Sequence, residues 1–261
     1  MPEGHTIHGL ARAMVELVGR DVSASSPQGR FAAAQVDGAQ VSGIEAYGKH
    51  LLIDTAGPGA TGEATVHVHL GMRGKWLRFA PVTGPGLPQV RLRLATPDVA
   101  WDLIAPSACD LFGPEQRSAL IARLGPDPLR PDADVEQARR NIAAFGGPIG
   151  AALLDQAVLA GVGNVFRAEV LHACRIAPDR PAGAVSDAEF DQLWTTLTAM
   201  MTTAVDEGRI ITVDADDRLA VPEDQSRRVY KQQACYDCGT PVVTSTVGGR
   251  TSYACPRCQA R

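Results

Sequence analysis

Apolar positions follow two different periods along the chain. Residues 3–18 place Ile7, Leu10, Met14 and Leu17 three or four positions apart, which predicts an opening helix that stops at Gly19. Between about residues 21 and 104, short β-rich runs are separated by glycine and proline clusters. These runs cover residues 40–46, 51–55, 64–70, 75–79, 90–94 and 99–103. We therefore predict a β-sandwich or barrel of roughly eight strands.

The second half of the chain has a helical repeat. Residues 125–131 contain too many prolines for regular structure, so we place a domain boundary there. Helices are predicted at residues 134–144, 148–158, 163–173 and 186–206. The last begins with a capping box, Ser186-Asp187-Ala188-Glu189, and its apolar stripe is expected to be core. Residues 212–226 are polar and weakly periodic, which predicts a flexible loop.

A quartet of cysteines is the strongest local signal, and its members are Cys235, Cys238, Cys255 and Cys258. Two CxxC pairs at this spacing can converge on one tetrahedral zinc ion, and four protein ligands leave no open position, so the zinc would be structural. The alternative is a pair of reduced CxxC motifs or a redox dithiol. Residues 242–244 and 251–253 alternate as a hairpin around Gly248-Gly249, which would present Arg250 to a phosphate. Cys109 and Cys174 are expected to be reduced and buried.

The chain is acidic overall, but its C-terminal segment is basic. A net charge of −4 and a pI near 5.9 argue against a polyanionic partner for the chain as a whole. Residues 227–261, however, carry +5, which leaves −9 on the rest, so a basic footprint is local to the cysteine-rich segment. Of 25 basic residues only three are lysines, at Lys49, Lys75 and Lys231. Arginine cannot lose its proton, so it cannot replace a lysine where a neutral amine is needed.

Length and composition fit a globular protein of one large or two ordinary domains. The sequence has 261 residues, of which 45% are hydrophobic, enough for a packed core. No run of eighteen apolar residues is present, and Glu3 and His5 occupy positions where a signal peptide would need a basic and then an apolar segment. We expect a cytosolic protein with no membrane partner.

Pro2 becomes a secondary amine once Met1 is removed. An N-terminal amine has an unperturbed pKa near 8, so a substantial fraction is neutral and nucleophilic at working pH. Taken alone, Pro2 is simply a residue that permits removal of Met1. An amine nucleophile at one end and a metal finger at the other together indicate DNA repair.

Ordered motifs extend along the whole chain. They are Met1-Pro2-Glu3-Gly4, Tyr47-Gly48-Lys49-His50-Leu51-Leu52, His69-Leu70-Gly71-Met72-Arg73-Gly74, Leu154-Asp155-Gln156, Ala160-Gly161-Val162-Gly163-Asn164, Val229-Tyr230-Lys231, and Arg250 five residues before Cys255. In these motifs the chain resembles the formamidopyrimidine-DNA glycosylase/endonuclease VIII family. The opening, through His5 and Thr6, is most similar to a bacterial endonuclease VIII paralogue group.

This resemblance implies an α+β fold of two domains. The N-terminal part would be a helix plus a β-sandwich, the catalytic domain, over residues 1–125. A helical DNA-binding domain with a helix-two-turns-helix motif would follow at 132–226, and a four-cysteine zinc-finger hairpin at 227–261. The implied activity is that of a bifunctional DNA glycosylase/AP lyase in the bacterial cytosol. We expect a monomer with one structural Zn²⁺, no organic cofactor, and damaged DNA as its partner.

The resemblance also implies roles for single residues. Pro2 would attack C1′ of the damaged nucleotide to form a Schiff base, and Glu3 would protonate the sugar ring oxygen. The alternative for Glu3 is a solvated glutamate that the dipole of the helix favours. Lys49 would assist proton transfer and contact phosphate, rather than be an ordinary surface lysine. Met72 would fill the gap left by an everted base, with core packing as the alternative.

The remaining implied residues bind the DNA backbone. Asn164, Lys231 and Arg250 would contact phosphates, and Arg250 is also implied in the catalytic set. The glycines around Val162 do not form a dinucleotide fingerprint, because Phe166 occupies the third glycine position. His67 and His69 share a strand face, but without a third ligand in view a metal site there is disfavoured.

Departures from the family pattern affect the expected substrate. The formamidopyrimidine branch has a glutamate where this chain has Thr6, and two further gap-filling residues, an arginine and a phenylalanine, are not recognisable at residues 102–106. Residues 212–226 contain no recognisable 8-oxoguanine-capping motif, which favours oxidised pyrimidines as substrates. The resemblance implies that the strand is then cleaved by β,δ-elimination. The competing hypothesis is a damaged-DNA-binding protein with little or no chemistry. A zinc-ribbon module unrelated to repair would leave Pro2, Lys49 and Asn164 unexplained.

Overall fold

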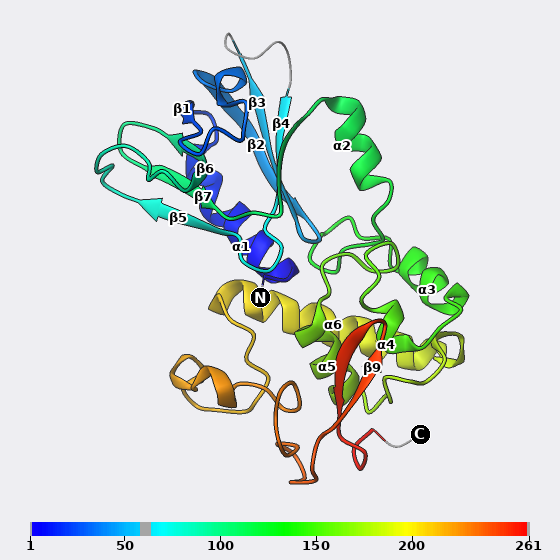
Figure 1. Cartoon of the computed structure of the whole chain (residues 1–261). Helices are drawn as coiled ribbons and strands as arrows, with labels where there is room; N and C mark the ends of the chain where they lie inside the picture. Colours follow the sequence, from blue (N-terminus) through cyan, green and yellow to red (C-terminus); the bar gives the residue numbers. More distant parts are fainter. Residues whose placement is uncertain (1, 58–63, 260–261) are drawn as a thin grey trace. The chain divides into compact units, whose positions relative to one another are not determined.

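The computed structural model describes residues 2–57 and 64–259, and the chain divides into two units, Met1–Arg123 and Leu124–Arg261 (Figure 1). The first unit opens with helix α1 (Gly4–Met14), which continues as a single 3-10 turn to Leu17 and so accounts for most of the predicted 3–18 helix. Ile7, Met14 and Leu17 are buried, and α1 packs against β2 and β3 of the sheet. The predicted apolar stripe is therefore the core-facing side of the helix.

Eight antiparallel strands form the body of the first unit in its described residues. They are β1 (Asp21–Ser25), β2 (Ala39–Tyr47), β3 (His50–Ala56), β4 (Ala64–His69), β5 (Lys75–Phe79), β6 (Val90–Ala95), β7 (Ala100–Ile104) and β8 (Ala108–Phe112). Their order is β5-β7-β6-β1-β2-β3-β4-β8. β1 pairs with β2 at its start and with β6 at its end, so it joins the two halves. Leu51 and Ile53 from one half and Leu92 and Leu94 from the other share one core, which confirms the predicted sandwich.

One helix of the first unit was not predicted. Helix α2 (Pro114–Ile121) contacts β4 and β8, and Leu120 is its one buried residue. Its Arg117 forms ion pairs with Glu45 on β2 and Asp54 on β3. Asp54 belongs to the face of β3 opposite Leu51 and Ile53, because neighbouring residues of a strand point to opposite faces. The polar face of the sheet is thus lined by charged side chains.

The second unit is helical, with a hairpin near its end. Its helices are α3 (Val135–Ala144), α4 (Ile149–Ala152), α5 (Asn164–Ala173) and α6 (Asp187–Glu207), followed by strands β9 (Val243–Val247) and β10 (Arg250–Ala254). The capping box of α6 is present, since the side chains of Ser186 and Glu189 each accept from the other's backbone N–H. Phe166 on α5 and Phe190 and Leu197 on α6 lie in one core.

Helix α4 is shorter than the predicted helix at 148–158. It ends at Ala152, and the backbone turns again at Asp155, whose side chain accepts from the N–H of Ala157 at 2.9 Å. Residues 212–226 contain two 3-10 turns, and Arg209 and Arg218 donate to backbone carbonyls of this stretch. No described helix is both long and apolar enough to cross a membrane.

Candidate functional site

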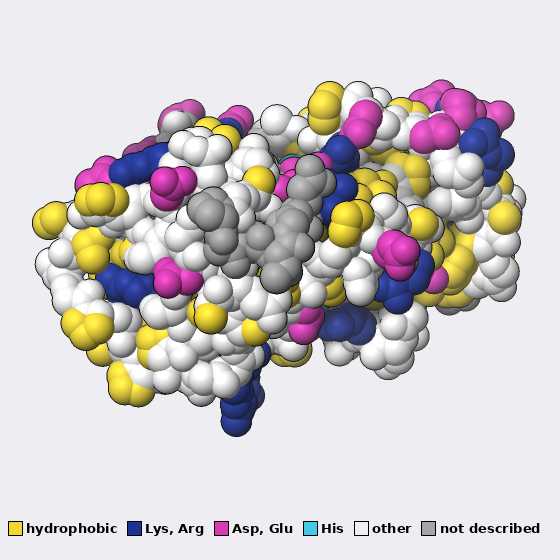
Figure 2. Space-filling view, turned by 90° about the horizontal axis from the view of Figure 1, so that it is seen from above, with side chains coloured by type: hydrophobic (Ala, Val, Ile, Leu, Met, Phe, Trp, Pro, Cys, Tyr) yellow, Lys and Arg dark blue, Asp and Glu magenta, His cyan; other side chains and the backbone are white. Residues whose placement is uncertain are grey.

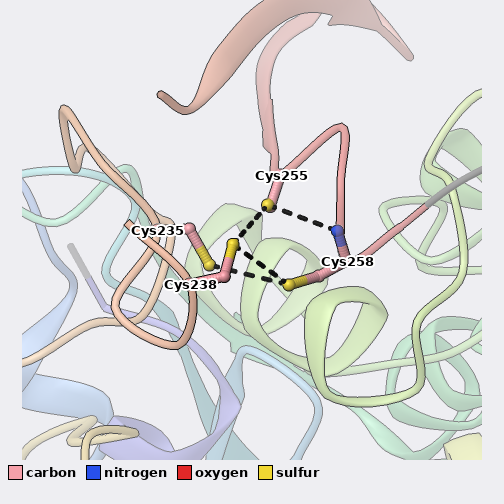
Figure 3. Close-up of side chains that lie close together, drawn as sticks. All are labelled: Cys235, Cys238, Cys255 and Cys258. Carbon is pink, nitrogen blue, oxygen red and sulfur yellow. Dashed lines mark hydrogen bonds between the residues drawn. The ribbon is translucent and has the colours of Figure 1, made fainter. Parts of the chain in front are cut away.

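The four cysteines of the second unit converge on one point (Figure 3). The Sγ of Cys238 lies 3.5 Å from that of Cys255 and 3.5 Å from that of Cys258, and the sulfurs of Cys235 and Cys258 are 4.0 Å apart. Four sulfurs bound at 2.3 Å to one tetrahedral ion would lie about 3.8 Å apart. A disulfide would need about 2.05 Å. The geometry therefore fits a four-thiolate metal site.

Helix α5 holds the hairpin of the finger through a buried arginine. Arg167 is wholly buried and donates to the carbonyl oxygens of Val247 on β9 (2.8 Å) and Thr251 on β10 (2.8 Å). It also donates to the Oδ1 of Asn164, and the Nδ2 of Asn164 donates to the same carbonyl of Thr251 at 3.0 Å. Asn164, the first residue of α5, is thus hydrogen-bonded to Thr251, the residue that follows Arg250 on β10.

The side chain of Gln156 makes three hydrogen bonds within the loop before α5. Gln156 accepts from the N–H of Gly161 at 3.0 Å and donates to the carbonyls of Val162 (3.1 Å) and Leu154 (2.9 Å). Gly161 has a φ of +91°, a conformation that favours glycine. The motifs around Gln156 and Gly161 therefore describe one loop that leads the chain into Asn164.

A second buried residue of α5 anchors the segment before the finger. Glu169 is wholly buried, and its carboxylate accepts from the backbone N–H groups of Arg228 (2.8 Å), Val229 (3.0 Å) and Tyr230 (2.7 Å). Three successive N–H groups around one carboxylate form an anion-binding nest. Lys231 follows directly, in a left-handed conformation with φ +58°, and is exposed. Neither Arg167 nor Glu169 was singled out from the sequence.

Fewer basic side chains of residues 227–261 are available to bind an anion than the sequence alone suggests, because some of them form ion pairs. Arg227 is paired with Glu223, and Arg228 is paired with Asp214 and Asp237. Arg250 is exposed and forms no ion pair in the described part of the chain. On the face shown in Figure 2, basic and acidic side chains are interspersed without an extended patch of one sign. In the described part of this segment, Lys231, Arg250 and Arg257 are therefore the exposed cations without an ion-pair partner, and they remain available to an anion.

In the first unit, the N-terminal residues are positioned by α1. Pro2 is half-buried, and Glu3 is the N-cap residue, with its carbonyl accepting from the N–H of Thr6 at 3.0 Å. Glu3 is wholly buried, which excludes the alternative of a solvated glutamate. This places a buried carboxyl group one residue from the nitrogen of Pro2, which would be a secondary amine once Met1 is removed.

Lys49 lies in the tight turn between β2 and β3. Gly48 before it has a φ of +57°, and His50 after it opens β3. The Nδ1 of His69 on β4 donates to the carbonyl oxygen of Lys49 at 3.0 Å. The turn that carries Lys49 is thereby tied to the neighbouring strand.

Met72 projects from a rigid turn between β4 and β5. Its side chain is 72% exposed, which excludes core packing. Gly71 has a φ of +65°, and a Cβ there would lie 1.7 Å from the Oγ of Ser107. A Cβ on Gly74 would lie 2.4 Å from the carbonyl oxygen of Leu70. Only glycine fits at either position, so the turn is fixed while the side chain at its tip stays in solvent.

Comparisons with known proteins agree with this geometry. The model of the formamidopyrimidine-DNA glycosylase N-terminal domain matches residues 1–102, and the model of the H2TH domain of the same enzyme matches residues 124–215. The chain is 40% identical to Endonuclease 8 1 of Mycobacterium tuberculosis, across 99% of this chain and 100% of that protein. It is 30% identical to a DNA-(apurinic or apyrimidinic site) lyase of Mycolicibacterium smegmatis, across 99% of each.

Solved structures show the same fold. The Lactococcus lactis formamidopyrimidine-DNA glycosylase in complex with abasic-site DNA superposes with a TM-score of 0.79 at 21% identity, covering 99% of this chain and 100% of that one. The paired domain matches and the full-length relatives lead to one assignment. The chain belongs to the formamidopyrimidine-DNA glycosylase/endonuclease VIII family.

Proposed function

We propose that this chain is a bifunctional DNA glycosylase and AP lyase of base excision repair that removes oxidised pyrimidines. The observation that carries the proposal is the pairing of Pro2 with the wholly buried Glu3 at the start of α1, in a full-length member of a glycosylase family. A nucleophilic amine and a carboxyl group in adjacent positions can act on two bonded atoms of the sugar, the amine on C1′ and the carboxyl group on the ring oxygen.

The reaction begins at C1′ of the damaged nucleotide. The amine of Pro2 attacks C1′, and the bond from C1′ to the base breaks with its electron pair leaving on the base, which takes up the proton that the amine loses. The bond from C1′ to the ring oxygen then breaks as Glu3 protonates that oxygen, and the nitrogen lone pair of Pro2 completes the Schiff base. Lys49 assists proton transfer beside the DNA strand. Elimination of the flanking phosphates then cleaves the DNA at both sides of the sugar. Water completes the cycle by hydrolysing the imine and freeing Pro2.

The second unit binds the DNA backbone. Arg250 and Lys231 offer exposed, unneutralised cations, and Asn164 is fixed beside Arg250 through Thr251. Such contacts set affinity and position without reading sequence. Cys235, Cys238, Cys255 and Cys258 would hold one Zn²⁺, which would act as a structural staple for the hairpin that presents Arg250. The working form is a monomer with damaged DNA as its partner.

The substrate class follows from what the chain lacks. Residues 212–226 show two short 3-10 turns pinned by arginines and no segment recognisable as a cap for 8-oxoguanine. We expect kcat/KM for 5-hydroxyuracil in duplex DNA to exceed that for 8-oxoguanine by about tenfold or more. Differences in the contacts that two substrates make in a pocket commonly produce discrimination of this size. Single-turnover excision from matched oligonucleotides measures this. Equal rates would reject the pyrimidine preference, and no excision of either base would favour a damage-binding protein without chemistry.

Met72 is proposed as the wedge that occupies the vacated base stack. Met72→Ala should lower kcat/KM for excision from duplex DNA by about tenfold or more, and change excision from single strands by less than about twofold, because only a duplex has a stacking gap to fill. Leu87→Ala is a matched control, since Leu87 is also an exposed apolar side chain of the first unit. A duplex-to-single-strand ratio that stays at the wild-type value would remove Met72 from this role.

A further inference from the structure

A buried histidine of helix α5 lies against the four-cysteine site. His172 belongs to the last turn of α5, and its side chain is only 1% exposed. The Nε2 of its ring lies 3.3 Å from the Sγ of Cys235. Cys235 is buried as well, so this contact is shielded from solvent. His172 comes from outside the finger and was not singled out from the sequence.

The sulfur is the nearer of two acceptors beside this ring nitrogen. The Oδ2 of Asp237 lies 3.8 Å from the Nε2 of His172, which is too long for a hydrogen bond, and Asp237 is paired with Arg228. A cysteine that binds a metal ion has lost its proton, so its sulfur can only accept. When the four cysteines hold the metal, the Nε2 of His172 must therefore carry a proton and donate it to Cys235.

The other ring nitrogen of His172 supports the same assignment. Its Nδ1 is buried, and no described residue forms a hydrogen bond with it. A neutral imidazole carries one proton, on one nitrogen or the other. A proton on Nδ1 would be a buried donor without an acceptor, whereas a proton on Nε2 meets the sulfur. Both nitrogens thus indicate a ring that is protonated at Nε2.

The cysteine that receives this hydrogen bond is one of the two buried members of the quartet. Cys235 and Cys255 are buried, whereas Cys238 and Cys258 are partly exposed and can accept from water. A buried negative charge must be stabilised by donors of the protein itself. Cys255 accepts from the backbone N–H of Cys258 at 3.4 Å, and Cys235 accepts from the backbone N–H groups of its own knuckle. The imidazole gives Cys235 a further donor, from outside the finger.

We propose that His172 is a positioning residue of the metal site, which orients the Cys235 thiolate and stabilises its charge through an N–H···S hydrogen bond. This inference rests on the zinc site of the proposed function. The bond also joins the first CxxC knuckle to α5, the helix that begins with Asn164. Hydrogen bonds to metal ligands typically change metal affinity by about 10–100-fold.

The second knuckle is attached to the same end of α5 by a different kind of contact. The Nε2 of Gln259 donates to the carbonyl oxygen of Ile176 at 2.9 Å, and its Oε1 accepts from the N–H of Cys255 at 2.9 Å. These bonds of Gln259 reach the backbone and not a sulfur. His172 instead bonds to a ligand atom, so its loss is expected to act on the metal and not only on the attachment of a knuckle.

Two substitutions separate the hydrogen bond from packing. His172→Phe keeps a planar ring without an N–H, whereas His172→Gln places an amide N–H near the position of Nε2. We expect the Kd for Zn²⁺, measured by competition with a chelator, to rise about 10–100-fold in His172→Phe and less than about fivefold in His172→Gln. Wild-type affinity in His172→Phe, or equal weakening in both variants, would overturn the proposal.

A matched control comes from β10. Ser252 is also a buried polar residue of this region, and its hydroxyl has no hydrogen-bond partner among the described residues. Ser252→Ala should keep the Kd for Zn²⁺ within about twofold of wild type, because no bond to a metal ligand is lost. A loss in Ser252→Ala as large as that in His172→Phe would show that any buried change here weakens the site, which contradicts a specific role of His172.

DNA binding shows whether the effect of His172→Phe passes through the metal. At saturating Zn²⁺ its Kd for abasic-site DNA should lie within about twofold of wild type, because mass action refills the weakened site. At limiting Zn²⁺ its DNA affinity should fall together with zinc occupancy. A loss of DNA affinity that excess Zn²⁺ does not restore would mean that His172 acts through the packing of α5, and it would reject the proposal.

The wild-type protein allows a test without any variant. Proton–nitrogen correlation spectra of isotope-labelled histidine in the zinc-loaded protein should show His172 protonated at Nε2 and bare at Nδ1. With spin-active cadmium in place of zinc, the Nε2 proton should show scalar coupling to the metal through the sulfur. A proton on Nδ1 with Nε2 bare refutes the hydrogen bond. A wild-type chain that binds no zinc is a different result, and it rejects the metal site of the proposed function.

Discussion

Pro2→Gly is expected to reduce the borohydride-trapped adduct on abasic-site DNA by about 100-fold or more, which corresponds to about 2.7 kcal/mol of transition-state stabilisation. Glycine retains a terminal amine, so the change removes the pyrrolidine ring and not the nucleophile. A secondary amine forms an iminium ion that is positively charged without being protonated, and this charge makes C2′ acidic. A primary amine forms an imine that must first gain a proton.

Two measurements make this result interpretable. Intact mass shows whether Met1 has been removed, because a chain that keeps it has no proline amine. Filter binding to the same abasic-site DNA shows whether the variant still binds. Strong trapping by a preparation that retains Met1 would refute Pro2 as the nucleophile, and the adduct would then involve the α-amine of Met1 or one of the three lysines.

Cys238→Ser should release zinc and unfold the finger, because metal binding supplies roughly 10–16 kcal/mol in small four-ligand domains. The damage should extend to α5. Once β9 and β10 unfold, Arg167 loses its carbonyl acceptors at Val247 and Thr251, and Asn164 loses Thr251. Affinity for every DNA should therefore fall by more than the loss of Arg250 alone. The sandwich and the other helices should remain, since the core of the sandwich contains no finger residue and the helical core is contacted only at its edge, by the partly buried Tyr230.

Metal content by elemental analysis and far-ultraviolet circular dichroism test this prediction together. We expect zinc to drop from one ion per chain to almost none, with only a small loss of ellipticity. Thr240→Ala is a suitable control, because Thr240 contacts the Sγ of Cys238 at 3.3 Å but is not a ligand. A global collapse of the spectrum in Cys238→Ser would show that the finger is needed for the whole chain to fold.

Periodicity located the elements that carry strong local signals. Strand β5 was predicted with its observed bounds, Lys75–Phe79, and α6 within one residue at each end, because a capping box and an apolar stripe coincide there. Strand β1, with sequence DVSAS, and strand β8, with Asp110 at its centre, have weak alternation. Their pairing with β2, β6 and β4 makes them strands. Helix α2 buries only Leu120, so it has almost no apolar stripe to find.

Arg167 and Glu169, which support the site, could not be predicted from the sequence because their partners are also distant along the chain. Arg167 bonds to residues about 80 positions later in the chain, and Glu169 to residues about 60 positions later. A buried charge is improbable from sequence until its partners are known. Motifs identified the groups expected to meet DNA, whereas the groups that hold them come from long-range contacts.

The turn around Met72 has a consequence for how this protein can change. Gly71 and Gly74 fix the backbone, whereas residue 72 itself makes few demands on the fold. The side chain at position 72 can therefore be exchanged at little cost in stability, whereas Gly71, one residue before it, and Gly74, two residues after it, do not tolerate a side chain.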